Sequence, residues 1–131
     1  GLLYPAVRYL DALRLRARAT SWFVGQVIGR ADALLIPALS FPLPTIQETD
    51  ATGDPKSIEL MFRLARNTRP INYLGLPGLS VPCGRTKNGL PAGFQLVGRP
   101  FSEAMLFRVA RAYERETGCT DEAPPNAFKS G

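Results

Sequence analysis

The asparagine–glycine pair at residues 88–89 is the feature that most constrains how this chain can fold. Such a pair is typical of a tight β-hairpin turn, because both residue types tolerate the positive φ that the turn requires. Apolar runs flank it, LSVPC at 79–83 and AGFQLVG at 92–98, so we expect two antiparallel strands. The second strand is predicted to place Phe94, Leu96 and Gly98 on one face and Gln95 and Val97 on the other.

A turn rich in glycine and proline precedes the first of these strands. Gly75, Pro77 and Gly78 are expected to fix its path, because proline restricts φ and glycine permits a close backbone approach. Asn72 is expected to tie this turn to its neighbours through side-chain hydrogen bonds. Pro82 has no N–H to donate, so it places the end of the strand at a sheet edge or a bulge.

A long amphipathic helix is expected near the start of the chain, over residues 5–29. Pro5 is tolerated in its first turn, and Gly29 is a suitable end. Leu15 and Trp22 lie outside the main apolar stripe of this helix and indicate that its far side makes a second apolar contact. The stripe itself is predicted to hold Leu10, Leu13, Ala17, Thr20, Val24, Val27 and Ile28.

A second helix is expected between Ser102 and Gly118. Ser102 is predicted to cap it, and Phe101 and Leu106 have the spacing of a hydrophobic staple. Residues 119–131 are polar and are predicted to form a flexible tail. The buried stripe of the helix is predicted to hold Leu106, Val109, Ala110 and Tyr113.

Between these helices the sequence predicts a strand, a long loop and a further helix. The strand lies within 31–39 and is ended by Pro37, and the loop covers 40–57. The helix is expected over 56–68 with Ser57 as its N-cap, while Pro70 keeps Arg69 out of helical geometry. This order of elements predicts one α/β domain over residues 1–131, with a partial mixed sheet and flanking helices.

Composition excludes several classes of protein. A chain of 131 residues with 45% hydrophobic and 21% charged residues matches a globular domain rather than a disordered one. No apolar run is long enough to span a membrane, and the first residues lack the features of a secretion signal. The chain has a net charge of +5, but the arginines of the first helix are scattered around it instead of gathered on one face. This distribution disfavours a nucleic-acid-binding surface.

The reactive side chains each have an ordinary structural explanation. The chain has no histidine, so Ser80 and Ser102 lack the usual base that would activate them. Cys83 is expected to be a small buried filler, and Lys87 an exposed turn residue. The acidic residues of the loop match no calcium-binding pattern; they are Glu48, Asp50 and Asp54. From the residues alone we expect no catalytic, cofactor or metal site.

Two blocks of the sequence resemble the amidase signature family. TRPINYLGLPGLSVPCG at 68–84 matches the family pattern T-x-P-x-N-x-x-G-x-P-a-x-s-x-P-x-G, and GLPAGFQLVG at 89–98 matches G-l-P-x-G-x-Q-x-x-g. The run ADALLIPALSFPLP at 31–44 is similar to the family strand D-x-L-l-x-P-t. The matching positions are Thr68, Pro70, Asn72, Gly75, Pro77, Ser80, Pro82 and Gly84, then Gly89, Pro91, Gly93, Gln95 and Gly98, and Asp32, Leu34 and Pro37.

This resemblance implies hydrolysis of carboxylic amides by a Ser-cis-Ser-Lys triad, chemistry that needs no histidine, metal or cofactor. The triad belongs to the family's N-terminal portion, and no residue of this chain matches its motifs. The resemblance therefore implies a C-terminal fragment that completes the sheet and the substrate funnel, with no catalytic residue and no activity alone. The 40–57 loop is expected either to form a funnel wall or to be a variable surface insertion.

Two alternatives stay open. The glutamine-hydrolysing A subunit of tRNA-dependent amidotransferases carries an acid shortly before the T-x-P-x-N block, where this chain has Arg63 and Arg66, so a stand-alone amidase is favoured. The chain can also be an interaction module that self-associates through exposed apolar surface. We expect a small amide substrate only in the full-length enzyme, no membrane or nucleic-acid partner, and a cytoplasmic location, since Cys83 and Cys119 suggest no disulfide framework.

Overall fold

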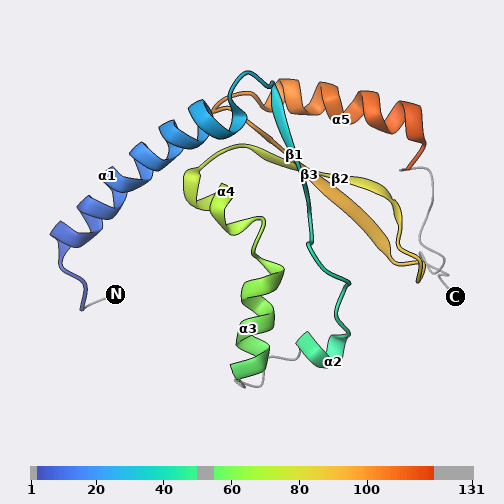
Figure 1. The fold of residues 1–131 in the computed structure, drawn as a ribbon, viewed down its shortest axis with the longest axis horizontal. Coiled ribbons are helices and arrows are strands. Elements are labelled where there is room, and N and C mark those ends of the chain that lie inside the picture. Colours follow the sequence, from blue (N-terminus) through green and yellow to red (C-terminus); the bar gives the residue numbers. More distant parts are fainter. Residues whose placement is uncertain (1–2, 50–54, 120–131) are drawn as a thin grey trace, which may run out of the picture.

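The computed structural model describes residues 3–49 and 55–119, which form a small sheet with helices around it (Figure 1). The chain begins with α1 (Ala6–Trp22), which continues into a wider π-helical segment, η1 (Phe23–Ile28). The remaining elements are β1 (Ala33–Pro37), α2 (Ile46–Thr49), α3 (Pro55–Leu64), α4 (Arg69–Leu74), β2 (Gly78–Arg85), β3 (Pro91–Gly98) and α5 (Glu103–Thr117). The partial α/β architecture predicted from the sequence is confirmed.

The sheet has the strand order β1-β3-β2, and the pairings on both sides of β3 are antiparallel. The hairpin predicted at residues 88–89 joins β2 to β3, with Gly89 at φ 78° and its N–H donating to the Thr86 carbonyl at 2.9 Å. The register of β2 shifts between Pro82 and Gly84. Gly84 has a φ of 106° there, so Pro82 lies at a bulge as expected.

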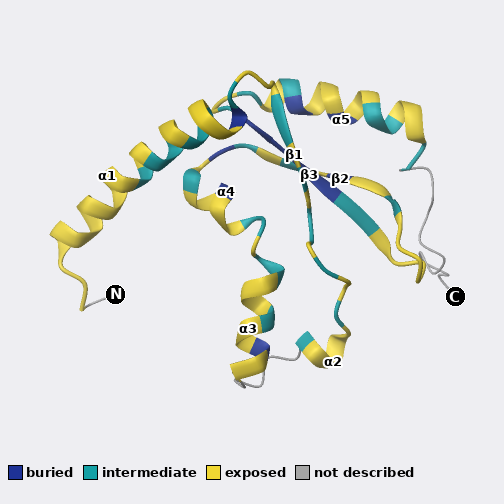
Figure 2. Cartoon of the chain, viewed as in Figure 1, coloured by how far each residue is buried: buried dark blue, intermediate teal, exposed yellow. Residues whose placement is uncertain are grey.

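Side chains of β3 point alternately into two separate cores, as the sequence predicted. Phe94 and Leu96 pack against α5, where the buried cluster also contains Val81, Leu106 and Ala110. Val97, with no exposed surface, packs on the other face against Ile71 and Leu76. Figure 2 shows that the buried surface is concentrated in the sheet and thins out along the helices.

The first helix forms as predicted, but most of its apolar stripe is not buried. Leu10 and Leu13 are 51% and 39% exposed, and no residue of α1 is buried, because the described residues place nothing against its first turns. Packing begins near Thr20, whose hydroxyl lies 3.0 Å from the Leu74 carbonyl oxygen of α4. Of the predicted stripe, Ile28 alone is buried, at the end of η1, where Gly29 has a φ of 58°.

The region before β2 corrects three expectations. α3 starts at Pro55, so Ser57 lies inside the helix and is buried rather than capping it. Pro70 does not exclude Arg69 from a helix: it sits in the first turn of α4, where the missing N–H removes no hydrogen bond. Asn72 belongs to α4 rather than to a turn. α4 ends at Leu74, and Gly75 follows as its C-cap with a φ of 68°, a left-handed conformation that favours glycine.

The start of α5 differs from its prediction although the position of the helix is right. Ser102 occupies the N-cap position, but its hydroxyl donates to the Arg99 carbonyl at 2.7 Å and caps no helix N–H. Phe101 is 95% exposed, so it forms no hydrophobic staple, and Val109 is 40% exposed. Gly118 ends the helix with a φ of 62°, as expected. The tail predicted for 119–131 lies outside the described residues beyond Cys119.

The segment predicted as a loop over 40–57 contains the short helix α2 and the start of α3. Residues 50–54, including Asp50 and Asp54, lie outside the described part of the chain. Among the helices that the structure describes, none combines the length and apolar character needed to cross a membrane.

Packing on the α5 face predicts unequal roles for two adjacent residues. Leu106 is 2% exposed and Phe107 is 61% exposed. Leu106→Ala should lower the free energy of unfolding by about 2–5 kcal/mol, because it leaves a cavity against β3. Phe107→Ala should change it by about 0.5 kcal/mol or less, as for most surface substitutions. Urea denaturation of both variants tests this, and equal losses would contradict the assigned core.

Candidate functional site

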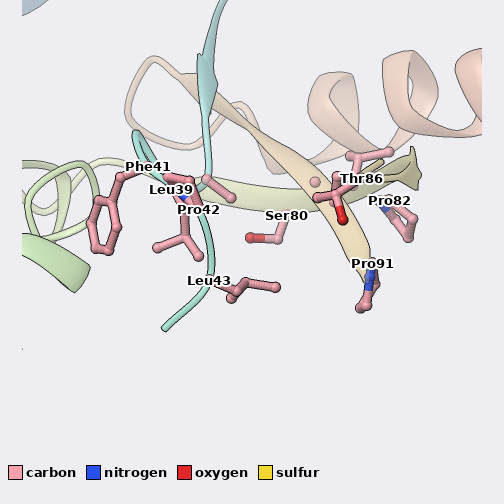
Figure 3. A pocket seen from close by; sticks show the side chains of 12 residues that line it. Leu39, Phe41, Pro42, Leu43, Ser80, Pro82, Thr86 and Pro91 are labelled. Carbon is pink, nitrogen blue, oxygen red and sulfur yellow. The ribbon is translucent and has the colours of Figure 1, made fainter. Parts of the chain in front are cut away.

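An open cleft of about 440 Å³ lies beside the hairpin. One wall is the segment 38–43 that follows β1, and the other is formed by β2 and β3 (Figure 3). Figure 3 shows Leu39, Phe41, Pro42 and Leu43 on the first wall, with Ser80 between them and Pro82, Thr86 and Pro91. The lining residues are Ala38, Leu39, Phe41, Pro42, Leu43, Ser80, Val81, Pro82, Thr86, Pro91, Ala92 and Gly93.

Asn67 fixes the first wall of this cleft in place. Its side-chain Nδ2 donates to the Pro37 carbonyl at 2.7 Å and to the Ser40 hydroxyl at 2.8 Å. The Arg63 guanidinium lies 4.6 Å from the centre of the Phe41 ring, a favourable cation–π arrangement. Helix α3 and the turn after it therefore position a segment that has no regular structure of its own.

The second wall contains four of the family-motif residues named from the sequence. Ser80 and Pro82 of β2 and Pro91 and Gly93 of β3 all line the cleft. A Cβ on Gly93 would lie 3.1 Å from the Val81 carbonyl oxygen, so this position favours glycine. Gln95 pairs with Ser80 across the strands but is buried, and its Oε1 has no hydrogen-bond partner among the described residues.

The other motif residues lie away from the cleft lining. Thr68 precedes α4, and its hydroxyl donates to the Ala65 carbonyl at 3.3 Å. Pro70 and Asn72 lie in α4, and in residues 3–49 and 55–119 the Asn72 side chain makes no hydrogen bond. In the first motif block, the remaining three residues lie at the end of α4, just before β2 and at the β2 bulge: they are Gly75, Pro77 and Gly84.

The described lining of the cleft offers apolar contacts and two hydroxyl groups. Hydroxyls of Ser80 and Thr86 are the polar side-chain groups in its lining, and no described lining residue is ionisable. Lys87 is exposed in the hairpin turn. Cys83 is exposed too, so the expectation of a buried filler is wrong: it sits where the β2 bulge turns outward. The described residues contain no cluster suited to a metal ion.

Two ionisable groups outside the cleft have shifted pKa values. Glu48 accepts hydrogen bonds from the Thr45 N–H at 2.7 Å and from the Thr45 hydroxyl at 2.9 Å. These bonds, the backbone one first, hold the pKa of Glu48 below 4.5. Desolvation raises the pKa of Tyr113 above 10.0, and the nearby Cys119 and Cys83 add to this effect.

Comparison with known proteins identifies the fold family. The family model described as Amidase matches residues 4–107. The chain belongs to the amidase family. The match includes all of β1, β2 and β3 and both walls of the cleft.

Individual amidase-family relatives are similar over most of this chain. The A subunit of a glutamyl-tRNA(Gln) amidotransferase from Myxococcus xanthus (strain DK1622) is 49% identical over 112 residues, which is 82% of this chain and 22% of the relative. A fatty acid amide hydrolase from Medicago truncatula is 33% identical over 121 residues, which is 92% of this chain and 20% of that protein. The chain therefore spans about a fifth of the length of these curated relatives.

Two features near this cleft were missed in the sequence. The pair Thr45 and Glu48 has the T-x-x-E spacing of a capping box, a local signal that predicts the start of α2. Asn67 has no such signal, because its partners lie 30 and 27 positions earlier and meet it only in the folded chain.

The role of Asn67 predicts a specific effect on the first wall of the cleft. Asn67→Asp keeps the side-chain shape but replaces the donor Nδ2 with an acceptor, so the hydrogen bond to the Pro37 carbonyl is lost, while the Ser40 hydroxyl can donate to the new carboxylate. Amide exchange in segment 38–43 should accelerate about tenfold, since a hydrogen bond contributes about 0.5–1.5 kcal/mol. Asn72→Asp is the matched control and should leave exchange there unchanged. Equal exchange in both variants would show that Asn67 does not anchor the wall.

The capping bonds of Glu48 predict a pH effect on α2. The lowered pKa means that the folded state favours the carboxylate, so this stabilisation is complete above pH 4.5 and is lost as pH falls through the folded-state pKa. An NMR titration of the Glu48 carboxyl should show its pKa rising in Thr45→Ala. The control Thr49→Ala removes a hydroxyl that bonds only to backbone carbonyls, and it should leave the Glu48 pKa unchanged.

Proposed function

We propose that this chain is the C-terminal portion of an amidase signature hydrolase, an enzyme that cleaves carboxylic amides to an acid and ammonia or an amine. In this role it completes the β-sheet and supplies one side of the substrate funnel, and it has no activity alone. The observation that carries the proposal is the cleft: both of its walls lie within the amidase match, and its described lining offers apolar contacts without an ionisable group.

The first wall of the cleft corresponds to part of the loop expected at the funnel. Leu39, Phe41 and Leu43 present apolar side chains to the cleft, and Asn67 fixes the backbone behind them. Such a wall suits the uncharged part of an amide substrate. No described side chain in the lining can deprotonate a serine, so bond cleavage is assigned to residues outside this chain.

A second candidate is a portion of the glutamine-using subunit of a tRNA-dependent amidotransferase. The name of the Myxococcus relative, 49% identical, favours it. Against it, Arg63 and Arg66 occupy the region where that subunit carries an acid, and Arg63 is directed to Phe41. We place either enzyme in the cytoplasm, which fits the free thiols of Cys83 and Cys119.

The proposal predicts that the purified 131-residue chain releases no ammonia from benzamide, butyramide or glutamine. The physical reason is that the described cleft has no group able to activate a nucleophile. A coupled ammonia assay at high chain concentration measures this. Turnover that survives repurification would sink the assignment of an inactive portion, and its loss in a Ser80→Ala variant would assign the nucleophile to the cleft.

A chimera tests the completing role directly. This chain replaces the matching segment of the Medicago truncatula fatty acid amide hydrolase, and hydrolysis of oleamide is measured. We expect the chimera to be active and the same protein with the segment deleted to be inactive. A folded but inactive chimera would count against a shared funnel, and activity in the deleted protein would count against the completing role.

A further inference from the structure

Cys83 has a distinct position in the sheet, because it is the extra residue of the β2 bulge. Its neighbours Pro82 and Gly84 have partners on β3, whereas Cys83 has none. Its side chain is exposed to solvent. A cysteine held at a bulge and open to solvent fills no gap in the core, so packing does not account for it.

The other cysteine of the chain lies just beyond the end of α5. Gly118 turns the chain there with a φ of 62°, and its N–H donates to the Glu114 carbonyl at 2.8 Å. Cys119 follows this turn and is half-buried. The chain has two cysteines, so Cys83 and Cys119 are all of its thiols.

Tyr113 of α5 connects the two positions. Its ring meets the Phe94 ring edge-on, with 5.0 Å between the ring centres, in the core that also contains Val81. Val81 comes two residues before Cys83 on β2, so Tyr113 lies over the strand close to the bulge. After desolvation, which is the largest cause, Cys119 and then Cys83 raise the pKa of Tyr113, an effect that both thiols exert from nearby. Both thiols therefore lie at the same end of α5.

We propose that Cys83 and Cys119 are a redox-reactive pair, which hydrogen peroxide oxidises to a disulfide that ties the β2 bulge to the end of α5. In the first step the exposed Cys83 thiolate attacks a peroxide oxygen; an S–O bond forms, the O–O bond breaks, and hydroxide leaves as water with the thiol proton. In the second step the Cys119 thiolate attacks the Cys83 sulfur; the S–S bond forms, the S–O bond breaks, and a second water leaves. The two thiols together lose two electrons, and the peroxide is reduced.

The closeness of a second thiol makes this oxidation reversible. A sulfenic acid without a neighbouring thiol can be oxidised further to a sulfinic acid, whereas a disulfide is returned to two thiols by a thiol reductant. Disulfides of this kind in a reducing compartment are usually transient and act in redox sensing or catalysis. This inference goes beyond the proposed function and does not depend on it.

The disulfide would act on the cleft through β2. Pro82, next to Cys83, lines the cleft, and Thr86 after the bulge lines it too. A bond from Cys83 to Cys119 closes a loop that contains all of β3 and α5. Oxidation therefore restrains the second wall of the cleft and leaves the first wall, which Asn67 fixes, as it is.

Oxidation of the purified chain with hydrogen peroxide, followed by alkylation of free thiols and peptide mapping by mass spectrometry, tests the pair. We expect a peptide linked through Cys83 and Cys119 within one chain, in a yield that is independent of chain concentration and reversed by dithiothreitol. The Cys119→Ser variant should stop at a sulfenic acid on Cys83, which dimedone traps. Sulfenic or sulfinic acid at Cys83 without a link in the unsubstituted chain, or a link only between chains, would overturn the proposal.

A displaced thiol is the matched control for chance encounter. Cys83→Ser combined with Lys87→Cys moves the exposed thiol from the bulge to the hairpin turn, which is also exposed. Because this position is farther along the hairpin from Val81 and Tyr113, the link to Cys119 should form about tenfold more slowly. Equal rates would show that the fold does not bring Cys83 and Cys119 together.

Amide hydrogen exchange measures the effect on the cleft. In the disulfide form the amides of residues 83–86 should exchange about tenfold more slowly than in the reduced chain, and those of segment 38–43 should be unchanged. Reduction should restore the original rates. A linked chain with unchanged exchange at 83–86 would contradict a restraint on the second wall.

Discussion

Strand β3 is the element on which the rest of the structure depends, because it is paired on both sides and buried on both faces. Its residues 94–98 are all buried, and they alternate between the core under α5 and the core under α4. Each neighbour of β3 has one free edge. The hairpin turn at Gly89 makes this arrangement local in sequence, so β2 and β3 can pair before distant parts of the chain contribute.

Beyond β3 the burial falls away quickly, and this pattern bears directly on function. The first turns of α1, the outer face of α5 and the exposed side of β1 all carry apolar residues without a described cover. Under the proposed function, such a surface would be covered by the rest of a longer enzyme, since the matched relatives are roughly four to five times longer than their matched segments. The same proposal would account for a cleft whose described lining is apolar and has no ionisable group.

The sequence predicted the parts of the fold that depend on short-range signals. Asn88-Gly89 located the hairpin, the alternation after Pro91 assigned Phe94 and Val97 to opposite faces, and Gly118 marked the end of α5. It failed where the outcome depends on neighbours. Leu10 and Leu13 have helical spacing but nothing to pack on, and Phe101 projects into solvent although its spacing fits a staple. Pro70 was assigned to a helix boundary, whereas it sits in the first turn of α4.

By itself the sequence determined the family, the strand pairing of the hairpin and the absence of histidine chemistry, because motif spacing and composition need no knowledge of neighbours. Only the tertiary structure decided that segment 38–43 faces β2 and β3 across a cleft, that Asn67 holds it there, and that β1 pairs with β3. These are contacts between residues about 30 or more positions apart. No local pattern specifies such contacts, because their free energy comes from surfaces that meet only when the chain is folded.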